Sequence, residues 1–119
     1  MNEAINSVIN QSYKNFHLYI IDDHSKDDSL KIIDNFSKKK NVTIVKLNKN
    51  MGPSFCSNYG MRISNSLYIS FIDSDDSWTN KKLEKQISFM EKENLDFTYT
   101  DYTPFFETKG KKRFKKKHL

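Results

Sequence analysis

The sequence predicts an α/β fold, in which a mainly parallel sheet has helices on both faces. Two observations indicate this class. Apolar residues recur with helical spacing in four segments, and each of these segments is followed by a short apolar run of strand length. Strands that alternate with crossover helices form parallel sheets, and right-handed crossovers bring the carboxyl ends of the strands to one edge. Ligands of such sheets bind at that edge.

The first half of the chain is predicted to contain two helix–strand pairs. The first helix presents one apolar face, made of Ala4, Ile5, Val8 and Ile9. The apolar run 16–21 has the length of a strand and ends in Asp22 and Asp23. Ser25 can cap a second helix, whose inner stripe is Leu30, Ile33 and Phe36. The run 42–47 is predicted to be the next strand.

The second half repeats this pattern after a loop at residues 48–52. Pro53 suits the first turn of a third helix, whose buried face is predicted to be Phe55, Tyr59 and Ile63. The strand 67–72 comes next, and Thr79 can start a fourth helix with Leu83, Ile87 and Met90 facing inward. A last strand is predicted at 97–100. The whole order is that of a Rossmann-like sheet.

Composition indicates one compact domain, expected at residues 1–103, followed by a basic tail at 104–119. The chain has 119 residues, of which 36% are hydrophobic. The tail holds seven basic residues, Lys109, Lys111, Lys112, Arg113, Lys115, Lys116 and Lys117, whereas the net charge is only +5. Like charges repel, so we expect a disordered tail; the alternative is attraction to nucleic acid or anionic lipid.

Several classes of protein are excluded by what the sequence lacks. Cys56 is the single cysteine, so an intramolecular disulfide and a cysteine-based zinc site are excluded. The three histidines, His17, His24 and His118, do not have the spacing of a zinc site or a catalytic triad. No apolar stretch has the 18 residues of a membrane span, so a soluble cytoplasmic protein is expected.

The run 68–76 is the most informative one for function, because a mostly apolar strand ends in Asp73, Asp75 and Asp76. Carboxylates suit Mg²⁺ or Mn²⁺, and such a metal usually completes its coordination with water and a substrate phosphate. Asp22 and Asp23 end another strand of the same sheet, so both clusters are predicted to lie at one edge. Carboxylates there can accept hydrogen bonds from a base or a ribose. The two clusters together predict a nucleotide-diphosphate site.

Each cluster also has an alternative explanation. Asp73, Asp75, Ser77 and Glu84 have the spacing of a calcium loop, but Trp78 stands where that loop needs glycine, so we reject this reading. Asp76 and Ser77 can simply cap the next helix. Residues 22–25 can be only a polar turn between a strand and a helix. Asp101 can lie near a sugar or be a solvated edge residue.

Four motifs in order resemble those of the family 2 glycosyltransferases, which have the GT-A fold. They are 5–16 (INSVINQSYKNF), 21–25 with 27–29 (IDDHS, DDS), 50–53 with 58–60 (NMGP, NYG) and 71–76 (FIDSDD), and the resemblance covers about residues 2–102. It implies that Asp23 together with Asp22 contacts the base. It further implies that Asp73 and Asp75 contact the ribose and hold Mn²⁺ or Mg²⁺, with Asp75 as the direct metal ligand.

The same resemblance implies a nucleotide-diphospho-sugar donor, expected to be a UDP-sugar, and a saccharide or lipid-linked acceptor whose hydroxyl receives the sugar. The family opens with a strand that precedes the helix at Ile5, so the chain is expected to be truncated at both ends. Cys56-Ser57-Asn58 stands where the family usually has Ala-Arg-Asn, so a basic residue is absent. The general base is expected outside this chain, which leaves the catalytic residue unknown.

These features support a glycosyltransferase-like protein in the cytoplasm or at the inner face of the membrane. Without the missing strand and the general base, we expect residues 1–119 alone not to turn over a sugar nucleotide. Two alternatives stay open. One is a non-catalytic α/β remnant, and the other is a binding module whose basic tail engages nucleic acid or an anionic membrane.

Overall fold

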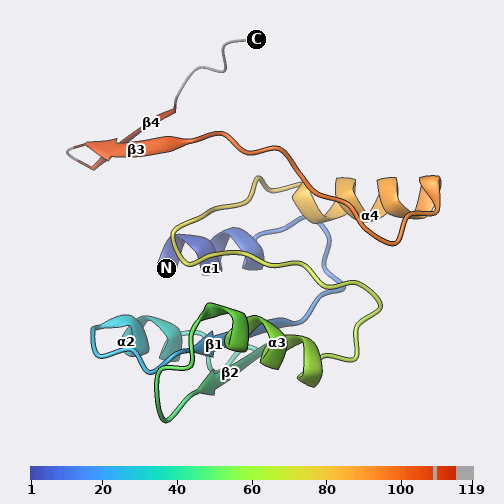
Figure 1. Cartoon of the computed structure of the whole chain (residues 1–119). Coiled ribbons are helices and arrows are strands. Elements are labelled where there is room, and N and C mark those ends of the chain that lie inside the picture. The colour runs from blue at the N-terminus through green and yellow to red at the C-terminus, as the bar shows by residue number, and fades with distance from the viewer. Residues whose placement is uncertain (109, 115–119) are drawn as a thin grey trace. The chain divides into compact units, whose positions relative to one another are not determined.

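The computed structural model describes residues 1–108 and 110–114. The chain forms two compact units, Met1–Lys85 and the segment from Gln86 onward. The helices are α1 (Asn2–Ile9), α2 (Ser29–Asp34), α3 (Pro53–Ile63) and α4 (Lys82–Glu93). The strands are β1 (Leu18–Asp22), β2 (Val42–Lys46), β3 (Phe105–Thr108) and β4 (Lys111–Phe114), as Figure 1 shows.

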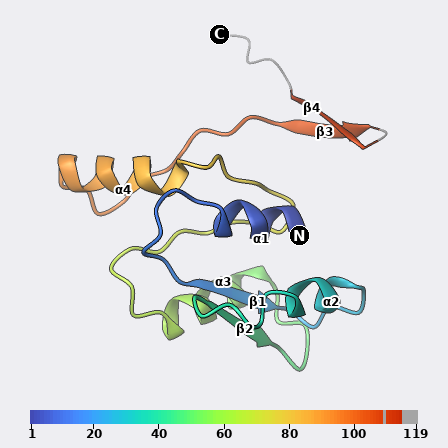
Figure 2. The same ribbon diagram turned by 180° about the vertical axis from the view of Figure 1, so that it is seen from behind.

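The first unit is built around the parallel pair β1–β2. Leu18 lies opposite Val42 and Asp22 lies opposite Lys46. The connection between the two strands contains α2, as Figure 2 shows. A parallel pair joined by a helical crossover confirms the predicted α/β class.

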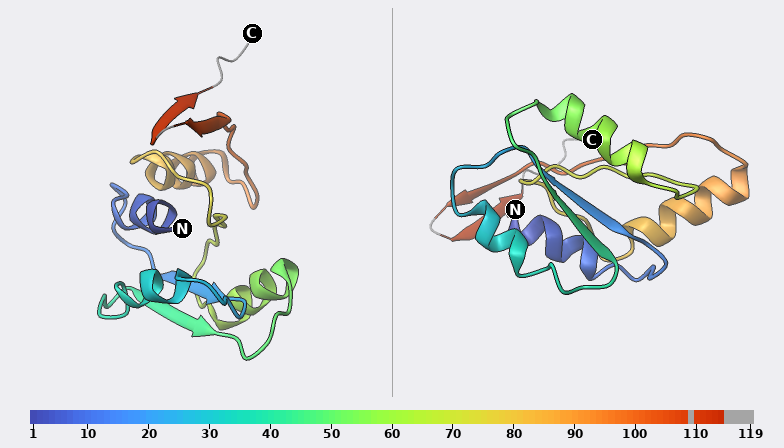
Figure 3. Two further views of the ribbon diagram at one scale, coloured as in Figure 1. Left: turned by 90° about the vertical axis from the view of Figure 1, so that its left-hand side faces the viewer. Right: turned by 90° about the horizontal axis from the view of Figure 1, so that it is seen from below.

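Helices lie on both faces of this pair (Figure 3). On one face, a buried cluster joins α1, α2 and β2; its members are Ile5, Ile33, Phe36 and Val42. Leu18, Ile20 and Ile44, at alternate strand positions, pack against this cluster, as the twofold periodicity of strands requires. Ile21 points to the other face and lies close to Gly60 of α3. A Cβ atom added at Gly60 would be 3.9 Å from Ile21 Cγ1. The predicted inward faces of the first two helices therefore form the core.

The predicted strand 67–72 is not part of the sheet, and this expectation was wrong. The segment has no regular secondary structure, and no described residue pairs with it in a ladder. Three of its apolar side chains are exposed: Leu67 is 86% exposed, Ile69 47% and Phe71 56%. An apolar run has the composition of a buried parallel strand, yet it becomes one only when a neighbouring strand accepts and donates its backbone hydrogen bonds. β1 has such a neighbour on the β2 side only, within the described residues.

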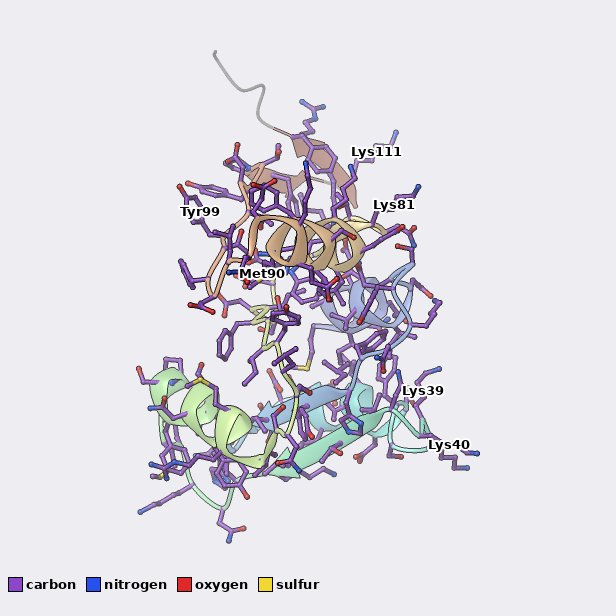
Figure 4. The ribbon with its side chains drawn as sticks, turned by 90° about the vertical axis from the view of Figure 1, so that its right-hand side faces the viewer. Lys39, Lys40, Lys81, Met90, Tyr99 and Lys111 are labelled. Atoms are coloured by element: carbon purple, nitrogen blue, oxygen red, sulfur yellow. The ribbon has the colours of Figure 1, made fainter. Side chains whose placement is uncertain are left out.

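The predicted strand 97–100 is also absent, and Phe97 and Tyr99 are largely exposed. Tyr99 projects away from the backbone in Figure 4. The second unit instead contains the antiparallel hairpin β3–β4, in which Phe105 pairs with Phe114 and Gly110 takes a positive φ of 71° in the turn. The rings of Phe105 and Phe114 lie 5.9 Å apart. Cross-strand aromatic pairs stabilise such hairpins.

This hairpin lies within the basic tail predicted at 104–119, and the predicted disorder of that tail stays a prediction. Residues 109 and 115–119 of that tail lie outside the described residues. The predicted domain 1–103 stays a prediction. Among the described residues, no helix combines the length and the apolar character that crossing a membrane requires.

Candidate functional site

Asp23, just beyond the end of β1, is held by the backbone that precedes α3. Its carboxylate accepts the N–H of Met51 at 2.6 Å and the N–H of Gly52 at 2.8 Å. Gly52 has a φ of 86°, which a glycine adopts without strain, and Pro53 then starts α3. Each carboxylate oxygen has two lone pairs, so Asp23 retains capacity for a further donor.

Asp22, at the last position of β1, is 4% exposed. Its Oδ2 accepts the N–H of Ser25 at 3.2 Å. Its Oδ1 is buried and has no hydrogen-bond partner among the described residues. Leaving a buried acceptor unpaired costs roughly 1–3 kcal/mol, so native proteins usually supply a donor from another group, water or a ligand. The end of β1 therefore contains a buried carboxylate oxygen that can accept an N–H from a ligand.

The turn after these aspartates is strained. His24 has a φ of 62°, in the left-handed region that non-glycine residues rarely adopt. This conformation redirects the chain directly after Asp22 and Asp23. Backbone strain of this kind clusters at functional sites, where the surrounding structure maintains it.

Cys56 lies in the first turns of α3, near the same aspartates. Burial raises the pKa of its thiol, and the neighbouring Asp23 and Asp22 raise it further. Reactive cysteines have a lowered pKa, so Cys56 does not have the character of a nucleophile. Ser57 and Asn58 are exposed on α3 and add no positive charge.

The second acidic cluster forms a tight turn at residues 73–76. The N–H of Asp76 donates to the carbonyl of Asp73 at 3.1 Å, and the side chains of Asp73, Asp75 and Asp76 are exposed. In the part of the chain that the structure describes, no three His, Cys, Asp or Glu side chains converge on a point where a metal could bind. A set of two carboxylates still fits Mg²⁺ or Mn²⁺, because substrate phosphates and water complete the coordination of these ions.

The predicted meeting of the two clusters at one sheet edge rested on a strand at 67–72. Because that segment is not in the sheet, the shared edge does not follow from strand topology. The proximity of Asp73 and Asp75 to Asp22 and Asp23 stays a prediction. The predicted roles of these four residues likewise stay predictions.

Gln11, which the sequence analysis did not single out, ties the end of α1 to the segment after the acidic turn. It is 0% exposed. Its Nε2 donates to the carbonyls of Ser7 at 3.0 Å and Thr79 at 2.7 Å, and its Oε1 accepts the N–H of Leu83 at 2.9 Å. A signal was present in the sequence, since Gln11 is a polar residue on the helical face of Ala4 and Val8.

Lys82, at the start of α4, contacts the segment on each side of the acidic turn. Its Nζ lies 3.8 Å from the ring centroid of Trp78 and donates to Ser70 Oγ at 2.6 Å. Burial lowers the pKa of Lys82 to about 8. An ammonium over an indole face is stabilised by the ring quadrupole, which opposes part of the cost of its burial.

Comparison with known proteins identifies the class to which this chain belongs. The family described as "Glycosyl transferase family 2" matches residues 1–118. The chain belongs to this family. The resemblance seen in the four sequence motifs is thereby confirmed.

Relatives are found in several bacteria. An uncharacterized glycosyltransferase of Haemophilus influenzae is 43% identical over 103 residues, which are 86% of this chain and 41% of that protein. The UDP-Glc:alpha-D-GlcNAc-diphosphoundecaprenol beta-1,3-glucosyltransferase WfaP of Escherichia coli is 38% identical over 99 residues, 83% of this chain and 39% of that protein. The chain thus spans about two fifths of the length of these two relatives.

Among solved structures, S. aureus TarS (residues 1–349) in complex with UDP superposes with a TM-score of 0.71 at 26% identity. The match covers 77% of this chain and 28% of that one. This likeness confirms the predicted GT-A type of α/β fold.

Proposed function

We propose that this chain is the nucleotide-binding part of a glycosyltransferase that uses a UDP-sugar as donor. The unpaired, buried Oδ1 of Asp22 carries the proposal, because a carboxylate oxygen there suits the N–H of a uracil ring. The fold match to a protein in complex with UDP and the kinship to a UDP-glucose-dependent transferase support the same donor.

In the proposed site Asp22 accepts the N–H of the base, and Asp23 lies beside it, held by Met51 and Gly52. Asp73 and Asp75 would hold Mn²⁺ or Mg²⁺ together with the diphosphate oxygens. Such an ion supplies charge neutralisation of the diphosphate leaving group. Asp76 has a backbone role in the turn, through its N–H to Asp73.

The proposed reaction transfers the sugar to an acceptor hydroxyl. The hydroxyl oxygen forms a bond to the anomeric carbon, while the bond from that carbon to the diphosphate oxygen breaks and the diphosphate takes the electron pair. The hydroxyl proton goes to a general base that we do not assign to a residue of this chain. The carboxylates described above act on donor binding and on the leaving group.

Calorimetry of UDP binding tests the donor site. We expect Asp22→Asn to weaken UDP binding about tenfold or more, since an amide offers the base one acceptor and no charge. Mn²⁺ is expected to enhance UDP binding, and Asp75→Ala to remove that enhancement. Asp76→Ala, in the same turn, is the matched control and is expected to retain the enhancement. Equal UDP affinity with Mn²⁺ and with chelator would count against the metal site.

A second proposed property is contact with an anionic membrane through the hairpin β3–β4. Lys111, Arg113 and Phe114 are exposed there, and each basic residue near an anionic bilayer contributes about 1 kcal/mol of attraction. A lipid-linked acceptor, as in the name of the WfaP relative, would be reached from that surface.

Cosedimentation with vesicles tests this contact. Lys111→Glu with Arg113→Glu is expected to reduce sedimentation with phosphatidylglycerol vesicles. Lys39→Glu with Lys40→Glu, which changes two exposed lysines before β2 (Figure 4), is expected to reduce it less. Equal losses in both pairs would indicate only a general charge effect, and binding of RNA in preference to vesicles would favour the nucleic-acid alternative.

A further inference from the structure

We propose that Gln11 is a positioning residue for the metal-binding turn: through the segment 78–83 it fixes the backbone that presents Asp73 and Asp75. The inference rests on the proposed function for the role of those two aspartates. It concerns a residue just after the end of α1, outside the acidic turn itself, and assigns Gln11 no contact with nucleotide or metal.

The side-chain amide of Gln11 makes three hydrogen bonds. Both hydrogens of a primary amide can be donated and its oxygen can accept; in Gln11 the Nε2 donates to Ser7 and Thr79 and the Oε1 accepts from Leu83. Ser7 lies in α1, whereas Thr79 and Leu83 flank the start of α4. One buried side chain therefore joins two segments that are about 70 residues apart in sequence.

Further hydrogen bonds follow the same line. Ser7 Oγ accepts the N–H of Trp78 at 3.1 Å, and the N–H of Ser12 donates to the carbonyl of Asn80 at 2.9 Å. Asn80 in turn donates to the carbonyl of Asn10. We call the contacts of Ser7, Asn10, Gln11 and Ser12 with residues 78–84 the α1 clamp. Gln11 is its most buried member.

The clamp matters for the acidic turn because, among the described residues, no strand holds that turn. Residues 67–72, on the amino side of the turn, make no ladder hydrogen bonds with described residues. On this side, the hydrogen bond from Lys82 to Ser70 connects the segment to α4. On the other side, Trp78 is bound to Ser7 only three residues after Asp75. The backbone on the carboxyl side of the turn is thus fixed by α1. Gln11 binds two groups farther along the chain, the carbonyl of Thr79 and the N–H of Leu83.

The test compares Gln11→Met with Ile33→Val. Methionine has nearly the length of glutamine but lacks all three hydrogen-bonding groups, whereas Ile33→Val removes one methylene from a fully buried α2 position that makes none of the hydrogen bonds of the clamp. Each protein is measured at the same number of degrees below its own thermal unfolding midpoint, so that a general loss of stability does not account for a difference between the variants.

Two readouts separate positioning from stability. The first is the ratio of UDP affinities with Mn²⁺ and with chelator: we expect Gln11→Met to reduce this ratio about tenfold and Ile33→Val to leave it within twofold of the unchanged chain. UDP affinity in chelator is expected to change less than twofold in both variants. A ratio unchanged in Gln11→Met, or reduced equally in Ile33→Val, overturns the proposal.

The second readout needs neither UDP nor metal. Hydrogen exchange of the Asp76 amide, which donates to Asp73, is expected to accelerate at least tenfold in Gln11→Met, while the β1–β2 ladder amides keep their protection. Unchanged Asp76 exchange overturns the positioning role. A different result is also informative: Mn²⁺ does not enhance UDP binding in the unchanged chain, but Asp76 exchange still accelerates in Gln11→Met. This result would refute the metal site and would still support the clamp.

Discussion

The carboxylate of Asp23 accepts the backbone N–H of Gly52 at 2.8 Å, across 29 residues of sequence. This contact joins the end of β1 to the start of α3, and the N–H of Met51 adds a second bond to the same carboxylate. Asp23 also raises the pKa of the Cys56 thiol in α3, after burial as the larger cause. A residue expected to bind a nucleotide therefore also shapes the loop around its own site.

The first prediction concerns that thiol. A raised pKa reduces the thiolate fraction near neutral pH, and the thiolate is the form that reacts with disulfide reagents. Asp23→Asn removes a negative charge beside Cys56, so its pKa should fall and labelling with an aromatic disulfide reagent at pH 8 should accelerate several-fold. When labelling rates are measured from pH 7 to 10, the increase in rate should begin at a lower pH in Asp23→Asn than in the unchanged chain.

The control for this experiment is Asp34→Asn, on the exposed end of α2, which should leave the labelling rate unchanged. Circular dichroism verifies that neither variant unfolds. A rate in Asp23→Asn equal to or below that of the unchanged chain would contradict the assigned electrostatic influence.

The fold could be predicted where local pattern and long-range pairing agree. The apolar stripe of α1 and the runs that became β1 and β2 had partners within the described residues, and Ile5, Ile33 and Val42 meet in one core. The run 67–72 had an equally strong pattern. Its failure to pair shows that composition indicates a tendency to be buried, while a neighbouring strand decides whether a ladder forms.

The second prediction concerns the strained turn after Asp23. An L-residue in the left-handed region costs roughly 1–2 kcal/mol, and glycine avoids this cost but loses roughly 0.5–1 kcal/mol to the extra freedom of its unfolded chain. His24→Gly should therefore raise the free energy of unfolding by up to about 1 kcal/mol, measured by urea denaturation.

Asn35→Gly is the matched substitution, because Asn35 has a φ of −60° at the end of α2. Glycine gains nothing there, and a loss of roughly 0.5–1 kcal/mol is expected. If both substitutions destabilise the protein equally, the turn at His24 is not strained in solution.

The third prediction concerns Lys82. Its pKa of about 8 lies below the unfolded value of about 10.4, so the unfolded state binds more protons between these two pH values. The contribution of Lys82 to the free energy of unfolding should therefore rise with pH across that window. Trp78 is the single tryptophan of the chain, and its emission should change with a midpoint near pH 8.

Lys82→Met should abolish that emission change and flatten the rise in stability. The control is Lys81→Met, which changes the exposed neighbouring lysine (Figure 4). It should leave both the emission change and the rise in stability in place. An emission midpoint above pH 10 in the unchanged chain would show that the ammonium is not buried as described.

The site could be predicted only in part, for a related reason. Asp22, Asp23, Asp73 and Asp75 stand out in sequence because carboxylates follow apolar runs, and residue types reveal chemistry. The polar Gln11 on the apolar face of Ala4 and Val8 was a visible signal, but its partners Thr79 and Leu83 are far away in sequence and are not displayed by a local pattern. Whether the four aspartates converge depends on strand pairing, which sequence periodicity does not determine.

The last prediction follows from the exposed segment 67–72. This segment has no ladder partner in the part of the chain that the structure describes, and it carries the exposed side chains of Leu67, Ile69 and Phe71. Such a segment is a template for pairing with other chains. We expect the chain to self-associate at micromolar to millimolar concentrations and to bind the dye ANS. Ile69→Lys with Phe71→Lys should reduce both effects, because charge on an edge segment opposes edge-to-edge pairing.

Met51→Lys with Met61→Lys is the matched control, since it also places two lysines on exposed apolar positions, 39% and 40% exposed, but outside the segment 67–72. Sedimentation velocity at several concentrations measures the association. If the segment 67–72 drives association, the first pair should shift the chain toward the monomer and the control pair should have a smaller effect, through net charge alone. Equal shifts in the two double variants would show that net charge, and not the segment 67–72, controls the association. If the chain without substitutions is monomeric, the apolar side chains of this segment are covered in solution.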